Sequence, residues 1–344
     1  MTVITRGFLR ALAAIFLFCA FTASAGAETA AEFYKGKVVK LIVGYSAGGG
    51  YDAYARFLAP HLEKRLGARV VVENRPGGGG NLALNQVAAA RPDGLNIMLI
   101  GAAIASFSQI VEAEGVRYQV GRLGFLGRVS DEKRILMISS EASFESFGDL
   151  LNASRPVRFG GTSRTATIAA GSAFVAEALG LDAQIIVGYK GSKEIALAAI
   201  RGEIDGFIPS DGSARHYGKE KGLRPFAVLS RERSPLLPDV PTVFELTELS
   251  PQQAWWIDYC DSLFGLGRAL VTTPDLPADR LAFLQQAVRD VLTDPAVIAE
   301  ADAAKRPVSY GTPELAKQMI NRLMDELSDE ELARVRYVAL EKYQ

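Results

Sequence analysis

The sequence is short of the side chains that build metal centres and disulfide frameworks. Its 344 residues include 2 histidines and 2 cysteines, and Cys19 lies inside an apolar run near the N-terminus. The remaining soft donors, His61, His216 and Cys260, are too few for a zinc or copper site. One cysteine outside the apolar run cannot form an intrachain disulfide. We therefore expect no metal, no disulfide and no cofactor.

Neither sign of charge is in excess, and long apolar runs are scarce. The chain has 38 Lys and Arg against 39 Asp and Glu, a formal net charge of −1 at pH 7. Nucleic-acid binding is disfavoured, because a phosphate backbone selects a basic surface. Beyond the N-terminus, no stretch approaches the ~18 uninterrupted apolar residues of a membrane-spanning helix. We expect the processed chain to be soluble.

The apolar run at the N-terminus predicts a signal peptide. Arg6 and Arg10 precede the apolar residues 11–22, and small residues that suit cleavage follow up to Ala27. A membrane anchor is the weaker alternative, because the run is too short to cross ~30 Å of hydrocarbon comfortably. We expect residues 1–27 to be removed on export.

The segment after the leader predicts strands that alternate with helices. Val38–Val43 is an apolar, β-branched run, and apolar residues then recur every four positions from Asp52 to Gly67, as on one face of a helix. Strands are predicted at 69–73 and 96–100, with a helix at 81–91 between them. This alternation is typical of a parallel sheet that is covered by helices on both faces.

A second series of similar units begins after about Val129 and predicts a second lobe. Its expected strands are 134–138, 157–159, 184–187, 204–208 and 225–229, and its expected helices are 167–179 and 192–201. A return strand at 263–272 and helices at 278–292, 295–304 and from Thr312 follow. The acidic run 325–331 is interpreted as the solvated face of a helix.

The turn Tyr45–Gly50 follows the first strand and leaves a catalytic and a non-catalytic interpretation open. Residues 44–48 match the G-x-S-x-G nucleophile elbow, with Ser46 as the nucleophile of a secreted serine hydrolase. That interpretation lacks an upstream strand for the oxyanion hole and leaves only His216 in the required order. Nucleotide binding is weaker still, because Gly48–Gly50 do not have the G-x-G-x-x-G spacing.

The second interpretation is a binding site without a catalyst. Glycines let the backbone approach a ligand closely, and the N–H groups of the helix that follows favour an anion such as a carboxylate. Asp52 lies in the first turn of that helix, where we expect it to pair with Arg56 four residues later rather than with a ligand.

Several motifs along the chain together resemble one family. They are LIVGYSAGGGYDAYAR (41–56), VENRPGGGGN (72–81), ARPDG (90–94), VGYKG (187–191), RGEID (201–205) and LPDVPTVFE (237–245). In this order they are similar to the substrate-binding proteins of tripartite tricarboxylate transporters, the Bug or TctC-like family. The resemblance implies an α/β fold of the two-lobed periplasmic binding protein type (type II, Venus-flytrap), each lobe a mixed, mostly parallel sheet flanked by helices.

The resemblance also implies a function and a domain plan. The chain is expected to be a monomeric periplasmic receptor, not an enzyme, that captures a small carboxylated solute (an organic acid, the class including aromatic and amino acids) and delivers it to membrane permease subunits. A sensor that passes the same ligand to a signalling partner is the alternative. Lobe 1 is expected at 28–129 plus about 250–310, lobe 2 at 130–249, and a C-terminal helical segment at 311–344.

The ligand-binding residues implied by the resemblance come from both lobes. They are Tyr45, Ser46, Ala47, Gly48, Gly49, Ala102 and Ala103 from lobe 1, and Thr162, Ser163, Arg164, Thr165 and Asp211 from lobe 2. The chain lacks the histidine that often follows the second-lobe Gly-Ser/Thr pair, and Arg164 could instead form a bidentate pair with a carboxylate; a solvent-facing arginine is the alternative. Trp255, Trp256 and Tyr259 are expected to pack between the lobes rather than to wall the cleft.

Overall fold

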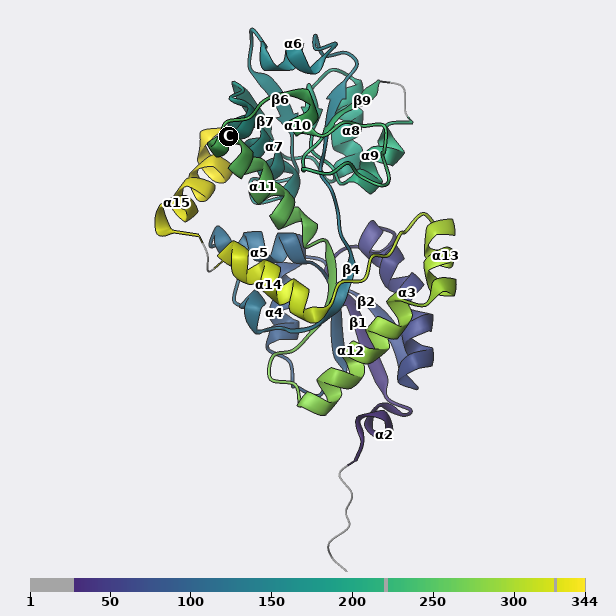
Figure 1. The fold of residues 1–344 in the computed structure, drawn as a ribbon. Helices are drawn as coiled ribbons and strands as arrows, with labels where there is room; N and C mark the ends of the chain where they lie inside the picture. The colour runs from purple at the N-terminus through teal and green to yellow at the C-terminus, as the bar shows by residue number, and fades with distance from the viewer. Residues whose placement is uncertain (1–27, 220–221, 325–326, 344) are drawn as a thin grey trace, which may run out of the picture.

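The computed structural model describes residues 28–219, 222–324 and 327–343. The predicted signal peptide, residues 1–27, lies outside the described residues. The described chain forms two α/β lobes, drawn one above the other in Figure 1. The first lobe lies below, where the purple and blue segments are joined by yellow-green helices from late in the chain, and the second lies above, mainly in teal and green. The expected lobe boundaries remain a prediction.

The first lobe contains a five-stranded sheet with the order β2-β1-β3-β10-β4 among the described residues. β1, β2 and β3 are parallel, with Val38 opposite Arg69 and Leu41 opposite Ile97, whereas β10 runs antiparallel to both of its neighbours. The strands are β1 (Val38–Val43), β2 (Arg69–Asn74), β3 (Asn96–Gly101), β4 (Gly124–Ser130) and β10 (Arg268–Thr272).

Helices cover both faces of this sheet because its strands are apolar on both sides. On one face Leu41 and Val43 pack against Leu58 and Leu62 of α3 and against Val288 of α12. The other face packs against α4 and α5. The helices of this lobe are α2 (Ala30–Tyr34), α3 (Gly50–Leu66), α4 (Asn81–Ala88), α5 (Ala102–Ile110), α12 (Ala278–Leu292), α13 (Pro295–Ala303) and α14 (Pro313–Met324).

The second lobe repeats the pattern with the strand order β7-β6-β8-β5-β9. Its antiparallel strand is β5, which again lies second from one edge. The strands are β5 (Ile135–Ser139), β6 (Val157–Gly160), β7 (Ala183–Ile186), β8 (Gly206–Phe207) and β9 (Leu223–Val228). The helices are α6 (Phe147–Leu151), α7 (Thr167–Leu179), α8 (Ser192–Ile200), α9 (Asp211–Tyr217), α10 (Val243–Leu246) and α11 (Pro251–Gly265), with α15 (Asp329–Tyr337) and a final π-helical turn (Val338–Lys342) beside them.

The antiparallel strands mark the places where the chain passes between the lobes. β5 begins after the short connection 131–134 from β4, and β10 begins two residues after α11, which runs from the upper lobe to the lower one (Figure 1). Each sheet is therefore completed by a strand that enters from the other lobe.

One prediction of local structure is wrong. Residues 263–265 are the end of α11 and not part of a strand, because α11 is apolar on several sides and its pattern does not show a helical period; Trp256, Ile257 and Leu263 are all fully buried. Of the acidic run 325–331, residues 325–326 lie outside the described residues. Asp329, Glu330 and Glu331 form the first turn of α15, as expected, and Ser328 caps this helix by accepting a hydrogen bond from the backbone of Glu331.

An aromatic cluster on α5, α7 and α11 joins the lobes. The ring of Phe174 stacks on Trp256 at 5.4 Å and meets Phe107 and Tyr259 edge-on at 6.1 and 5.5 Å. These side chains belong to one continuous apolar core that includes residues of both sheets. The expectation that Trp256 and Tyr259 pack between the lobes is confirmed.

The C-terminal segment crosses the same junction. Arg336 of α15 donates to the carbonyl oxygen of Ile110 at 2.7 Å, and so contacts the first lobe. Arg334, Lys342 and Tyr343 all contact the carboxylate of Glu177 on α7 in the second lobe. The end of the chain is thereby tied to both lobes.

Asp205, from the predicted motif 201–205, has a structural role in the second lobe. Its buried carboxylate accepts hydrogen bonds from Arg155 at 2.7 and 2.8 Å, and from the side chain and backbone N–H of Arg158. Burial alone would raise the pKa of Asp205, but these hydrogen bonds outweigh it and lower the pKa to about 2.

Truncation of the aromatic junction should destabilise the whole molecule. We expect Phe174→Ala to lower the free energy of unfolding by about 3–5 kcal/mol, because it empties a fully buried site between three helices. Urea unfolding followed by circular dichroism measures this. The control Leu246→Ala, at a side chain that is 37% exposed, should change stability by no more than about 0.5 kcal/mol. A loss below about 1 kcal/mol for Phe174→Ala would contradict the role of the cluster.

Removal of the Asp205 charge should alter how stability depends on pH. The pKa is about 2 in the folded state against the usual 3.8, so the carboxylate stabilises the fold above about pH 4, and this contribution is lost as the pH falls toward 2. We expect Asp205→Asn to cost about 2 kcal/mol at pH 7 and much less at pH 2. Glu203→Gln, at an exposed ion pair, is the control. An equal loss at both pH values would contradict the assignment.

Candidate functional site

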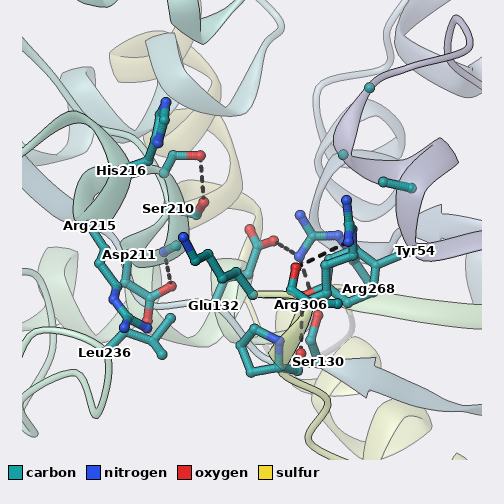
Figure 2. A pocket seen from close by; sticks show the side chains of 18 of the residues that line it. Tyr54, Ser130, Glu132, Ser210, Asp211, Arg215, His216, Leu236, Arg268 and Arg306 are labelled. Atoms are coloured by element: carbon teal, nitrogen blue, oxygen red, sulfur yellow. Dashed lines mark hydrogen bonds and ion pairs between the residues drawn. The ribbon is translucent and has the colours of Figure 1, made fainter. Parts of the chain in front are cut away.

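A cavity of about 800 Å³ lies between the lobes and is lined by both of them. Figure 2 shows the side chains that line it, with Arg268 and Tyr54 facing Asp211 and Arg215 across the space. The first lobe contributes Gly48–Gly50, Ala53, Tyr54, Ser130, Asp131, Glu132, Arg268 and residues 304–307, and the second contributes Ser210–Ser213, Arg215–Tyr217, Lys219 and Leu236. The ends of β1 and β4 and the beginnings of α3 and α9 thus meet at one cleft, which is where open α/β sheets usually bind ligands.

The glycine turn reaches this cavity because Asp52 holds it in shape. Gly48 has a φ of 84°, a left-handed conformation that favours glycine. Its N–H donates to Asp52 Oδ2 at 2.8 Å, and Arg56 Nε donates to the same oxygen at 3.0 Å. The hydrogen bond from Arg56, followed by that from Gly48, lowers the pKa of Asp52 to about 2. The predicted structural pair of Asp52 with Arg56 is confirmed.

Two tyrosines determine which residues of the first lobe reach the cavity. The ring of Tyr45 stacks on Tyr51 at 4.5 Å and points inward toward Gly80, where it lines a separate void of about 10 Å³. The hydroxyl of Tyr51 lies against Gly101, so closely that a Cβ atom there would clash with it. Behind this ring Ala102 and Ala103 are buried at the start of α5. Tyr45, Ala102 and Ala103 therefore do not line the cavity.

The remaining predicted residues fall into two groups. Gly48 and Gly49 line the cavity from the first lobe and Asp211 lines it from the second, while Ser46 and Ala47 are exposed on the adjoining turn. Residues 162–165 form the loop between β6 and α7, where Arg164 is exposed, and they are not among the lining residues. The structure thus brings together three of the predicted residues.

Asp211 is a buried acid that lines the cavity from the second lobe. It is the first residue of α9, its Oδ2 accepts a hydrogen bond from Ser234 Oγ at 2.7 Å, and its Oδ1 accepts one from the N–H of Gly212 at 2.8 Å. Burial raises the pKa of Asp211 although both hydrogen bonds oppose that change.

Apart from Asp211, the sequence analysis did not identify the charged residues that dominate the cavity. Among the described residues that line it, five are basic and three are acidic. The basic residues are Arg215, Lys219, Arg268, Lys305 and Arg306, and the acidic ones are Asp131, Glu132 and Asp211. Only Arg268 had a visible signal, since it is a charged residue at the start of an otherwise apolar strand; the others lie outside any recognisable motif.

Arg268 lies on the floor of the cleft at the start of β10. Its guanidinium group lies 4.5 Å from the ring centre of Tyr54 and 5.0 Å from that of Tyr51. Nη1 donates to Ser130 Oγ at 3.3 Å and forms an ion pair with Glu132 Oε1. Burial alone would lower the pKa of Arg268, but Glu132 and the neighbouring hydroxyls outweigh it, so the pKa is raised. The side chain is therefore a permanent cation.

No group of three or more His, Cys, Asp or Glu side chains in residues 28–219, 222–324 and 327–343 could hold a metal ion. In the same ranges no helix combines the length and apolar character needed to cross a bilayer.

Two α/β lobes of equivalent topology, joined by crossing segments and enclosing a charged cavity, define the class of two-lobed solute-binding proteins. The chain belongs to the tripartite tricarboxylate transporter family of receptors, whose family model matches residues 54–328. The predicted family and fold class are confirmed.

Individual relatives agree with this assignment. The BugT protein of Bordetella pertussis is 29% identical over 252 residues, which cover 69% of this chain and 74% of BugT. A Rhodopseudomonas palustris protein solved with adipate has a TM-score of 0.70 at 20% identity, covering 87% of this chain and 97% of its own. The MatC protein of Rhodopseudomonas palustris, solved with malate, has a TM-score of 0.65 at 20% identity and covers 88% and 99% of the two chains. At this identity the solved structures show the fold alone.

Proposed function

We propose that the protein is a monomeric periplasmic receptor that binds a small carboxylated organic solute between its lobes and passes it unchanged to the permease subunits of a tripartite tricarboxylate-type transporter. The observation that carries this proposal is the basic excess in a cavity shared by both lobes. Cations that converge on one cleft raise the local concentration of an anion and favour its binding over that of a neutral or cationic solute.

The size of the cavity and the relatives support the same ligand class. A volume of about 800 Å³ lies within the range of small-molecule sites and leaves room for the lobes to approach each other. The solved relatives contain malate and adipate, which are both small dicarboxylates. A solute of this kind, or an aromatic acid of similar length, fits the proposed site.

The predicted binding residues have different places in this proposal. Gly48, Gly49 and Asp211 contact the ligand from the cavity wall, and Ser46 and Ala47 lie beside them on the same turn. Arg164 lies on an exposed loop, and no acidic side chain among the described residues forms an ion pair with it. Closure of the lobes over a ligand would be needed to bring residues 162–165 to the site.

We infer that Ser46 is not a nucleophile. It is exposed on the turn, and no histidine in the described part of the chain donates to or accepts from its hydroxyl group. His61 lies on α3 and pairs with Glu300 at 3.3 Å, and His216 lies across the cleft in the second lobe. A serine hydrolase needs a base within hydrogen-bond reach of its nucleophile.

A thermal-shift screen tests the ligand class. Adipate, malate, benzoate, glutamate, glucose and putrescine form a suitable panel, because a ligand that binds only the folded state stabilises it by mass action. A carboxylate at about 100 times its dissociation constant should add about 2.7 kcal/mol and raise the melting temperature by several degrees. Stabilisation by glucose or putrescine alone would contradict the proposal.

The Ser46→Ala variant tests the absence of catalysis. We expect the wild type and the variant to release no p-nitrophenol from p-nitrophenyl acetate above the rate of the buffer, because Ser46 has no base to activate it. The variant should also bind the best ligand of the screen to within about threefold of the wild type, a change of under ~1 kcal/mol. Turnover by the wild type that disappears in the variant would instead establish the hydrolase alternative.

A further inference from the structure

The floor of the cleft is built where the two crossing segments meet. Glu132 lies in the connection 131–134 between β4 and β5, and Arg268 begins β10 directly after the second crossing. The ion pair between Glu132 Oε1 and Arg268 Nη1 joins the two segments, and both side chains line the cavity. Figure 2 shows the carboxylate of Glu132 directed at the guanidinium group of Arg268.

Arg268 has hydrogen-bonding capacity that the protein does not use. Both of its polar contacts, to Glu132 and to Ser130, are made by Nη1. Its Nε is buried and has no hydrogen-bond partner among the described residues. Within the same part of the chain no residue accepts a hydrogen bond from Nη2. A guanidinium group carries five donors, and groups this well covered are usually hydrogen-bonded. Because Arg268 lines the cavity, its guanidinium group can donate further hydrogen bonds to an acceptor on a bound solute.

If Glu132 leaves Arg268, its negative charge still has a positively charged partner, Arg134. Its second oxygen lies 3.6 Å from Arg134 Nη2, and Arg134 is buried with its guanidinium group 4.2 Å from the ring centre of Phe264. A carboxylate that lost its only partner in this setting would be costly to leave unpaired. Because Arg134 stays beside it, Glu132 can exchange one cation for the other.

We propose that Arg268 binds a carboxylate group of the solute, and that Glu132 is an internal carboxylate that occupies this position until the solute displaces it. This inference rests on the proposed function and names the residue that anchors the ligand. The incoming carboxylate takes the Nη1 position and the unused Nη2, as a bidentate pair. The displaced Glu132 moves to Arg134.

The exchange predicts opposite changes in ligand affinity when Arg268 and Glu132 are replaced. Removal of the cation by Arg268→Gln takes away the anchor, and we expect affinity to fall about 10- to 100-fold. Arg268→Lys keeps the charge but loses the planar fork, and should give an intermediate loss. Glu132→Gln removes the internal competitor, so apparent affinity should rise about threefold or more.

A double variant separates direct exchange from a general change of charge. Loss of the Glu132 charge would strengthen anion binding through long-range attraction whether or not Arg268 touches the ligand. If the two carboxylates compete for Arg268, the gain from Glu132→Gln should disappear in the Arg268→Gln background. A gain of the same size in both backgrounds would overturn the exchange.

The measurement is isothermal titration calorimetry at fixed ionic strength with the strongest binder among adipate, malate, citrate and benzoate. Arg231→Gln is the matched control, because Arg231 also pairs with a carboxylate, Asp258, and lies 4.5 Å from an aromatic ring centre, but does not line the cavity. It should bind like the wild type. Circular dichroism confirms that each variant is folded. If Arg268→Gln does not fold, the same comparison is made in the Arg268→Lys background, where the gain from Glu132→Gln should be smaller than in the wild type.

The outcomes distinguish this inference from the proposed function. If no carboxylate binds to the wild type, both fail. If a carboxylate binds to the wild type, and Arg268→Gln and Glu132→Gln each bind it with the affinity of the wild type, the receptor function stands and the assignment of Arg268 is wrong. Weaker binding by Arg268→Gln, with tighter binding by Glu132→Gln that depends on Arg268, supports the exchange.

Discussion

The aromatic packing between α5, α7 and α11 is the interaction on which the rest of the molecule depends. Phe174 contacts Phe107 of the first lobe and Trp256 of the helix that connects the lobes. Because these rings are buried against one another, the lobes meet over apolar surface on one side and leave polar surface at the cleft. The cavity is wide because the attraction between the lobes is concentrated behind it.

Charges in the cleft are balanced mostly by nearby residues of the same region. Asp52 neutralises part of the positive end of α3 and pairs with Arg56, and Glu132 lies between Arg134 and Arg268. A buried charge without a partner would be strongly destabilising, so each fixed charge near the floor has at least one counter-charge. What the floor lacks is enough acceptors for the donors of Arg268, and the proposed preference for an anionic solute rests on this imbalance.

Much of the fold could be predicted from the sequence because its elements have strong local patterns. Val38–Val43 is a continuous β-branched strand, and the stripe along Gly50–Leu66 has a clear helical period. α11 was not recognised, since a helix that packs against both lobes is apolar on more than one side and does not alternate. The strand expected at 263–272 was too long for the same reason.

On the first-lobe side, the sequence predicted the residues that line the cavity only where the backbone conformation determines their position. Gly48 has a left-handed conformation that favours glycine, and with the extended Gly49 after it the turn reaches the cavity; the sequence shows these glycines. The inward turn of Tyr45 depends on Tyr51, whose ring covers the end of β3, and such a choice between rotamers leaves no pattern in the chain. The pair of Glu132 with Arg268 joins residues that are far apart in the sequence and close only once both crossings have formed.

The C-terminal segment that ties the lobes together has a consequence for how the molecule is made. Its contacts to Ile110 and Glu177 join residues that are 226 and 157 positions apart in the chain. Contacts of such long sequence separation form late, because a large loop must close before they can contribute. Each sheet has most of its strands before residue 229, but the junction is complete only when the last twenty or so residues are available. The contacts of Arg334 and Arg336 with the two lobes therefore add to the aromatic junction only after this last segment has been synthesised.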